Sequence, residues 1–163
     1  ITRGKCAGCH FLPLFGGAVP PDYKVSDWEV IGTPDSDHRA KAQLDGDPGR
    51  GGVQRTSLYR HAFRTPGLRN VALTAPYMHN GVFNSLEEVL DFYNAGGGVG
   101  WGLNVPNQTL SSDSLRLTRE ERSKIIAFLK SLSDTAGLTS VPQKLPVFPR
   151  DPELNERKIG GAY

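Results

Sequence analysis

Two segments of the chain carry the hydrophobic spacing of amphipathic helices. In residues 86–95, large apolar or aromatic side chains stand at positions 86, 89, 90 and 93, the i, i+3, i+4, i+7 spacing that places them on one helix face. Ser85 and Glu88 form a capping-box signature at the start, and Gly96 follows as a C-terminal stop. The pattern predicts a helix between Ser85 and Gly96, with Tyr93 on its buried face.

A second helix is predicted over residues 119–132. Thr118 and Glu121 repeat the capping-box spacing in front of it. The apolar positions that continue it are Ile125, Ile126, Leu129 and Leu132. Shorter helices are expected around residues 6–10 and 68–71, and no segment alternates apolar and polar residues in the manner of a strand. We therefore expect an all-α fold with long irregular loops.

The connections between these helices are long. Residues 13–52 read as successive turns, and the glycine-rich residues 96–102 follow a helix rather than a strand, which predicts a mobile loop and not a dinucleotide-binding loop. Four prolines within residues 141–152 predict an extended tail that lies on the body or on a partner. The expected organisation is one domain over residues 1–135 and a Pro-rich C-terminal tail over residues 136–163.

The composition is typical of a chain with many loops and few disulfides to hold them. The chain has 19 glycines and 12 prolines among 163 residues, more than the roughly 12% of average usage, yet only 2 cysteines. A formal charge of +2 is too small for a nucleic-acid interface, and no stretch approaches the roughly 18 apolar residues of a membrane span. We expect neither a nucleic-acid partner nor a membrane span, and the loops must be organised by something other than disulfides.

Residues 6–10 supply a candidate, because they read Cys-Ala-Gly-Cys-His. Cys-x-x-Cys-His is the attachment pattern of c-type haem, in which Cys6 and Cys9 form thioethers and His10 reaches the iron as proximal ligand. The alternatives are a thioredoxin-like redox pair, a lone disulfide or half a zinc site. A redox pair should follow a strand and needs no histidine, and a zinc site needs two more ligands. The pattern predicts one covalent haem c.

Haem attachment of this kind requires reduced thiols on an exported chain. We therefore expect a periplasmic or otherwise exported protein. Only five residues precede Cys6, where a c-type cytochrome usually has a whole helix, so residues upstream of this sequence are expected.

The second axial ligand of the iron decides the chemistry, and the residues alone leave three candidates. Met78, the only methionine, lies 68 residues after His10 in a Pro-containing loop and would give a His/Met electron carrier of high potential. His79 would give a lower potential, and Tyr93 could approach from its helix as a phenolate. Each also has a structural alternative, as a gap filler, a hydrogen-bonding side chain or a core aromatic. On this evidence Met78 ranks first. The remaining histidines, His38 and His61, are expected in ordinary surface or hydrogen-bonding roles.

A longer ordered motif carries a family resemblance. Residues 63–81 read Phe-Arg-Thr-Pro-Gly-Leu-Arg-Asn-Val-Ala-Leu-Thr-Ala-Pro-Tyr-Met-His-Asn-Gly, and residues 86–94 follow with Leu-Glu-Glu-Val and Asp-Phe-Tyr-Asn. This set resembles the second haem domain of the bacterial di-haem cytochrome c peroxidases and their MauG-like relatives. The resemblance covers most of the chain from Cys6 to about Leu132 and implies a cytochrome c-like haem domain.

The resemblance changes the order of the ligand candidates. In the peroxidases the position of Met78 is commonly Phe, and the distal ligand lies fourteen residues beyond the residue that matches His79. That ligand is Met in peroxidases proper and Tyr in MauG-like enzymes, and here the position is Tyr93. The resemblance thus implies His10 and Tyr93 as the axial pair, with Met78 as the alternative.

Four more residues receive roles from the resemblance. Thr74 and Pro76 match positions whose backbone carbonyls bind a calcium ion between the two haem domains, and carbonyl oxygens suit that cation. The third protein ligand in the family comes from the other domain. Arg64 and Arg69 are candidates for contacts with the haem propionates, since Arg pairs well with carboxylates.

The functional expectation follows the family. A di-haem enzyme has two haem motifs and about twice this length, whereas this chain has one motif. It is expected to relay electrons between a small redox protein or protein substrate and a second haem domain or subunit, where peroxide is reduced. No catalytic acid or base for peroxide cleavage is expected here. The alternatives are a stand-alone mono-haem cytochrome with His10 and Met78 as ligands, and a cytochrome subunit docked in a larger complex by residues 141–152.

Overall fold

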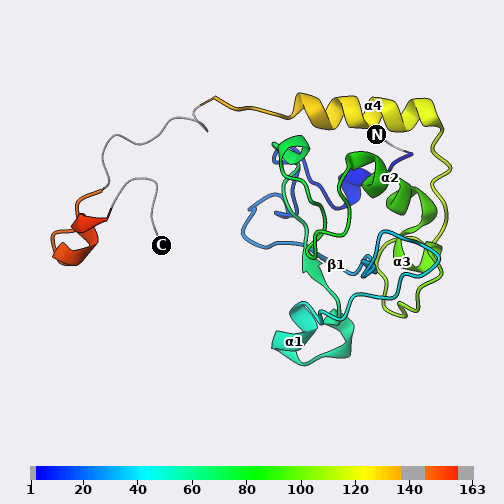
Figure 1. Cartoon of the computed structure of the whole chain (residues 1–163), viewed down its shortest axis with the longest axis horizontal. Helices are drawn as coiled ribbons and strands as arrows, with labels where there is room; N and C mark the ends of the chain where they lie inside the picture. The colour runs from blue at the N-terminus through cyan, green and yellow to red at the C-terminus, as the bar shows by residue number, and fades with distance from the viewer. Residues whose placement is uncertain (1–2, 137–145, 158–163) are drawn as a thin grey trace. The chain divides into compact units, whose positions relative to one another are not determined.

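The computed structural model describes residues 3–136 and 146–157 (Figure 1). The chain divides into two compact units, Ile1–Ser133 and Asp134–Tyr163. Within the described ranges no helix combines the length and apolar character that a bilayer crossing requires.

Helix α2, Leu86–Ala95, forms where its sequence predicts it, but Tyr93 is only half-buried and the neighbouring Phe92 is fully buried. The Ser85 hydroxyl accepts a hydrogen bond from the Glu88 amide at 3.2 Å, and the Glu88 carboxylate accepts one from the Ser85 amide at 3.1 Å, so the capping box is complete. The helix ends at Gly96, whose φ of +100° is a left-handed conformation that glycine adopts without strain.

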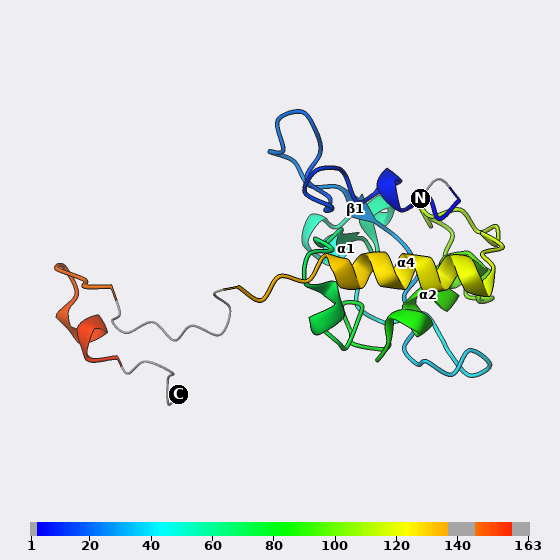
Figure 2. The ribbon, with the colours of Figure 1, turned by 90° about the horizontal axis from the view of Figure 1, so that it is seen from above.

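Helix α4, Arg119–Ser131, is likewise confirmed, with a capping box between Thr118 and Glu121. Figure 2 shows α4 crossing the first unit above α2. The apolar faces of the two helices meet in one core, against which the 3₁₀ turn η3, Val71–Leu73, also packs. The buried members of this core are Leu86, Leu90, Ile126 and Leu129.

The expectation of an all-α fold is wrong. Strands β1, Trp28–Glu29, and β2, Phe63–Arg64, pair antiparallel, with Trp28 opposite Arg64 and Glu29 opposite Phe63. Four short helices and this sheet are joined by irregular segments over the described residues. A strand of two residues is too short to display the alternation from which a strand is recognised in sequence.

The expected loop over residues 96–102 is also wrong in part. Residues Gly97–Gly100 form the short helix α3, and Gly97 and Gly98 are buried. A Cβ atom at Gly98 would lie 2.4 Å from the Gly32 carbonyl oxygen, and one at Gly96 would lie 2.1 Å from the Ser112 carbonyl oxygen. The glycines therefore permit close backbone contact and do not indicate a mobile loop.

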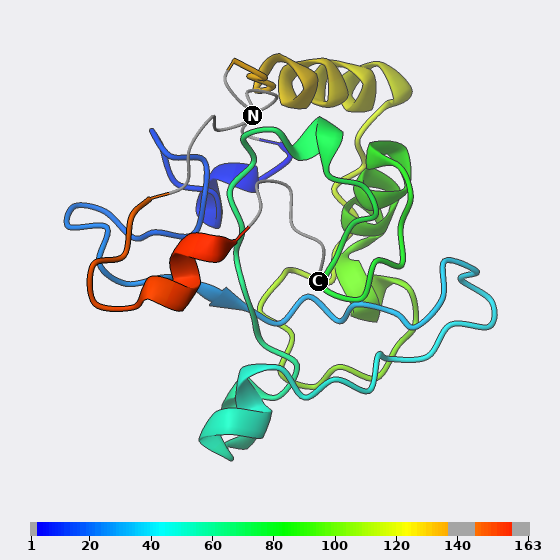
Figure 3. The same ribbon diagram turned by 60° about the vertical axis from the view of Figure 1, so that its left-hand side comes forward.

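A smaller lobe projects at the far side of the sheet from α4 (Figure 3). It contains helix α1, Arg50–Gln54, and the 3₁₀ turn η2, Ser57–Tyr59. A second core lies at its base, where Val30, Ala62 and Val105 are buried.

The loop that carries Met78 and His79 is tied to a distant turn. His79 Nε2 lies 3.0 Å from Asp45 Oδ1, and Asn80 donates to the Pro34 carbonyl at 2.8 Å. The His79 ring also stacks on Phe63 with ring centroids 3.6 Å apart. This segment is therefore held by side-chain contacts in place of regular secondary structure.

The second unit has local structure of its own. Residues Pro152–Glu156 form the 3₁₀ turn η4, and the Asn155 side chain bonds both to the amide of Phe148, at 2.8 Å, and to its carbonyl, at 3.2 Å. The part of the proline-rich segment over residues 141–145 lies outside the described residues.

Candidate functional site

The two cysteines lie on one tight turn. The 3₁₀ turn η1 spans Cys6–Gly8, and the Cys9 amide donates to the Cys6 carbonyl at 3.3 Å. Both thiols are free and partly buried. The geometry thus presents two neighbouring sulfurs that are not joined to each other.

The His10 ring is oriented by a backbone carbonyl. Its Nδ1 donates to the Phe15 carbonyl oxygen at 3.3 Å, which leaves Nε2 with its lone pair for a metal. Burial lowers the pKa of His10, and the carbonyls of Phe15 and Pro66 only partly offset that effect. The neutral imidazole that an iron ligand requires is therefore favoured.

The carbonyl that orients His10 is itself fixed from several sides. The Phe15 carbonyl also accepts the Leu68 amide at 2.9 Å, and the Phe15 amide donates to Phe11 at 2.7 Å. The Phe15 ring packs edge-on against Phe128 of α4, with centroids 5.8 Å apart. The loop that follows the cysteine motif is thus held by Leu68, which lies just before η3, and by Phe128 of α4.

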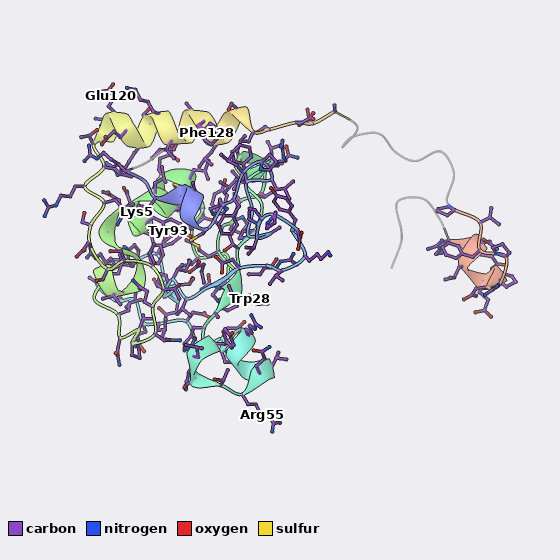
Figure 4. The ribbon with its side chains drawn as sticks, turned by 180° about the vertical axis from the view of Figure 1, so that it is seen from behind. Lys5, Trp28, Arg55, Tyr93, Glu120 and Phe128 are labelled. Carbon is purple, nitrogen blue, oxygen red and sulfur yellow. The ribbon has the colours of Figure 1, made fainter. Side chains whose placement is uncertain are left out.

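Tyr93 is positioned by the aromatic cluster beside it. The preceding residue, Phe92, is fully buried and packs against Phe83 and Trp101 at centroid distances of 5.5 Å. Burial raises the pKa of Tyr93, and the charges of Cys9, Cys6 and Glu29 raise it further. Figure 4 shows Tyr93 next to η1, in keeping with the effect of both cysteines on the pKa of Tyr93.

Glu29 is a site residue that the sequence reasoning missed. Its Oε1 accepts from Cys9 Sγ at 3.2 Å, and its Oε2 accepts a short hydrogen bond from the Thr109 hydroxyl. Burial, the hydrogen bond between Cys9 and Glu29, and the charges of Glu29 and Asp27 raise the pKa of Cys9 to about 12. Glu29 stands twenty residues from Cys9 on a two-residue strand, so no local pattern signals its place in the site.

The other candidates lie elsewhere. His79 Nε2 is already engaged with Asp45, and Met78 is half-buried with a left-handed φ of +70°. Arg64 Nε donates to the Ser26 hydroxyl at 2.5 Å, and Arg69 lies over the Phe15 ring, 5.7 Å from its centroid.

Thr74 and Pro76 stand on an exposed turn after η3. The Thr74 hydroxyl donates to the Val71 carbonyl at 3.1 Å. In the described part of the chain no three His, Cys, Asp or Glu side chains form a group that could hold a metal ion. Calcium at this turn would therefore depend on backbone carbonyls and on ligands from another domain.

The arrangement fits a covalently attached haem. Two unbridged thiols offer thioether positions on one turn, the Nε2 of His10 is directed away from the Phe15 carbonyl, and the half-buried Tyr93 side chain lies near the same turn. Histidine and a phenolate or thioether are all known haem-iron ligands. The donor set matches an iron porphyrin better than a zinc site, because no second cysteine pair exists.

Comparison with known proteins gives a consistent set of relatives, although no family model matches the chain. It is 39% identical to "Cytochrome-c peroxidase IdrP1" of Pseudomonas sp. (strain SCT) over 90% of this chain and 41% of that protein. It is 32% identical to "Methylamine utilization protein MauG" of Methylorubrum extorquens over 86% of this chain and 34% of that protein.

A solved structure agrees with these relatives. A MauG-like protein associated with microbial copper homeostasis matches with a TM-score of 0.57 and 28% identity, over 81% of this chain and 43% of that one. The chain spans between about one third and about two fifths of the length of these relatives.

The contact between Glu29 and Cys9 generates a prediction for the haem-loaded protein. Thioether formation removes the Cys9 proton, so the carboxylate loses a donor and keeps its negative charge close to the haem edge. Glu29→Gln should therefore raise the midpoint potential, because the removed charge favours ferric over ferrous iron, by on the order of 30–60 mV. Spectropotentiometric titration measures this shift.

The matched control is Glu120→Gln, which removes the same charge at the exposed start of α4 (Figure 4). It should leave the potential unchanged. An unchanged or lowered potential in Glu29→Gln would show that the carboxylate does not act on the haem.

Proposed function

Because the chain belongs to the family of the cytochrome-c peroxidases and MauG, we propose that it is a c-type haem domain that relays electrons between a redox partner and a second haem, where peroxide is reduced. The observation that carries the proposal is the convergence of Cys6, Cys9, His10 and Tyr93 on one site. This chain matches about two fifths of the relative's length, and a second haem would lie in a domain or subunit that corresponds to the remainder of that relative.

Each site residue has one task in this proposal. Cys6 and Cys9 anchor the porphyrin, and the Phe15 carbonyl keeps the proton of His10 on Nδ1 so that Nε2 remains a donor. Before iron is bound, Tyr93 keeps its phenolic proton, because burial and nearby negative charge raise its pKa. Binding of the phenolate to a cationic iron would release that proton. When bound, the haem supplies one-electron chemistry.

Tyr93 is the preferred distal ligand in this proposal. A phenolate donor stabilises ferric and higher-valent iron, so the haem would relay electrons at a lower potential than a His/Met carrier does. The nearby Glu29 carboxylate acts in the same direction, since a negative charge favours the more oxidised state. The second candidate, Met78, would instead make a His/Met electron carrier.

The remaining contacts belong to the same proposal. Arg69, which lies above Phe15, and Arg64, on β2, would pair with the haem propionates. The carbonyls of Thr74 and Pro76 would contribute to a calcium ion shared with the second haem domain. Covalent haem attachment places the protein in an exported, periplasm-like compartment.

The ligand assignment is tested by two single substitutions. Tyr93→Phe should abolish the phenolate-to-iron charge-transfer band of the ferric protein, because the ring remains but its oxygen donor is lost. Met78→Ala should leave that band in place. Optical and electron paramagnetic resonance spectra of the two variants, with haem content measured in each, provide the readout.

The opposite result would contradict this assignment. If Met78→Ala abolishes a thioether-to-iron band while Tyr93→Phe leaves the spectrum intact, the protein is a His/Met cytochrome. The haem content of each variant separates ligand loss from failure to incorporate haem.

The relay to a second haem is tested on the complete native polypeptide. Its intact mass and haem count should show two covalent haems, or one haem together with a co-purifying haem protein. One haem per polypeptide with no haem-containing partner would exclude the two-haem relay.

A further inference from the structure

Residues 48–61, which we call the arginine lobe, form a rigid projection around α1 and η2. The His61 amide donates to the Pro48 carbonyl at 2.9 Å, which closes the base of the lobe. The Asn107 side chain donates to the carbonyls of Ser57, Leu58 and Arg60 at distances of 2.9–3.3 Å. The two N–H groups of this amide, shared among three carbonyls, hold the backbone on this side.

The lobe is strongly asymmetric in charge. Residues 48–86 contain five arginines and no aspartate or glutamate, although the whole chain carries a formal charge of only +2. Three of the arginines lie in the lobe, at positions 50, 55 and 60. In the described part of the chain the four ion pairs all lie outside the lobe, so none of its arginines has a carboxylate partner.

Apolar side chains stand among these arginines at the surface. Val53 is 85% exposed and Leu58 is 67% exposed, and Val53 has the largest exposed fraction of the large hydrophobic residues in the described part of the chain. A cavity of about 530 Å³ lies beside Val53, and one of about 590 Å³ lies beside Leu58. Exposed apolar side chains beside arginines are typical of a protein-docking surface, and the one carboxylate that lines these two cavities is Asp47, at the edge of the lobe.

The lobe is connected to the candidate haem site. Arg50 lies over both the Trp28 ring, at 4.7 Å from its centroid, and the Tyr59 ring, at 4.2 Å. Trp28 directly precedes Glu29, whose carboxylate contacts Cys9 Sγ at 3.2 Å. Figure 4 shows Trp28 at the base of the lobe and Arg55 projecting from its tip. A partner on the lobe would therefore be linked to the site through two neighbouring residues of β1.

We propose that the arginine lobe docks an acidic redox protein and that one electron passes between this partner and the haem domain in each encounter. The inference rests on the proposed function and adds the partner's surface chemistry to it. In the transfer one centre is oxidised by one electron and the other is reduced by one, with no bond formed or broken. Val53 and Leu58 would contact apolar side chains of the partner, and the three arginines would face its carboxylates.

The chemistry of the lobe favours a protein over another polyanion. Val53 and Leu58 add exposed apolar surface to the lobe, which a nucleic-acid backbone or an anionic polysaccharide does not match. Unpaired guanidinium groups give fast, salt-sensitive encounters with carboxylates.

The experiment follows electron transfer from the dithionite-reduced, haem-loaded full chain to two oxidised probes in a stopped-flow instrument. The probes are an acidic plastocyanin and the basic mitochondrial cytochrome c, both of which accept electrons readily. We expect a faster second-order reaction with the acidic probe, and a rate that falls as ionic strength rises.

The decisive variant is Arg55→Gln/Arg60→Gln, which keeps Arg50 and its aromatic stack. This variant should transfer electrons to the acidic probe about tenfold more slowly than the wild type at low salt, and the difference should be much smaller at high salt. The matched control, Arg119→Gln/Lys130→Gln, removes the same charge from exposed positions on α4. It should have little effect on the rate, because docking and not net charge decides it.

Several results would overturn the proposal. They are equal rates in the wild type and the lobe variant, an equal loss in the α4 control, and a preference for the basic probe. Sedimentation that shows the lobe joining two copies of this chain, abolished in the lobe variant, would assign the surface to self-association and also overturn it.

Ferricyanide, a small oxidant that needs no docking surface, separates this failure from failure of the proposed function. If every variant is reoxidised by ferricyanide at the same rate while the lobe variant is unaffected with plastocyanin, only the docking proposal fails. If the haem-loaded chain is neither reduced by dithionite nor reoxidised by ferricyanide, the proposed function fails and the docking proposal fails with it.

Discussion

The hydrogen bond from His10 Nδ1 to the Phe15 carbonyl is the constraint around which the site is organised. It fixes the ring's orientation and tautomer, so that Nε2 remains the available donor beside the two thiols. The carbonyl holds its place because Leu68 shares it and Phe128 of α4 packs against the Phe15 ring. The packing of Phe15 on α4 therefore connects the helix core to the orientation of His10, although the His10 ring hydrogen-bonds to Phe15 and not to the core residues themselves.

The opposite side of the site depends on α2. Its capping box and the buried Phe92 fix the helix, and the next residue, Tyr93, is thereby directed toward the cysteine turn. Glu29 enters from β1 and adds a negative charge at Cys9. Three elements distant in sequence thus meet at one place. In the haem-loaded protein this environment would stabilise oxidised iron, in keeping with the task proposed for the domain.

Local signals in the sequence predicted local features correctly. The capping boxes at Ser85 and Thr118 needed only four neighbouring residues each, and both helices begin where those residues stand. The all-α expectation failed because β1 and β2 are two residues long and pair across 35 positions of sequence. The contact of Gly98 with Gly32 and that of Glu29 with Cys9 arise only when distant segments fold together, so no periodicity encodes them.

Resonance Raman spectroscopy of the ferric haem-loaded chain tests the central assignment most directly. The protein is prepared with ring-deuterated tyrosine and, separately, with methyl-deuterated methionine, and is excited in its ligand-to-iron charge-transfer band. The account predicts enhanced phenolate ring modes that shift only with labelled tyrosine. Absence of these modes, or ligand modes that respond only to labelled methionine, would contradict the pairing of His10 with Tyr93.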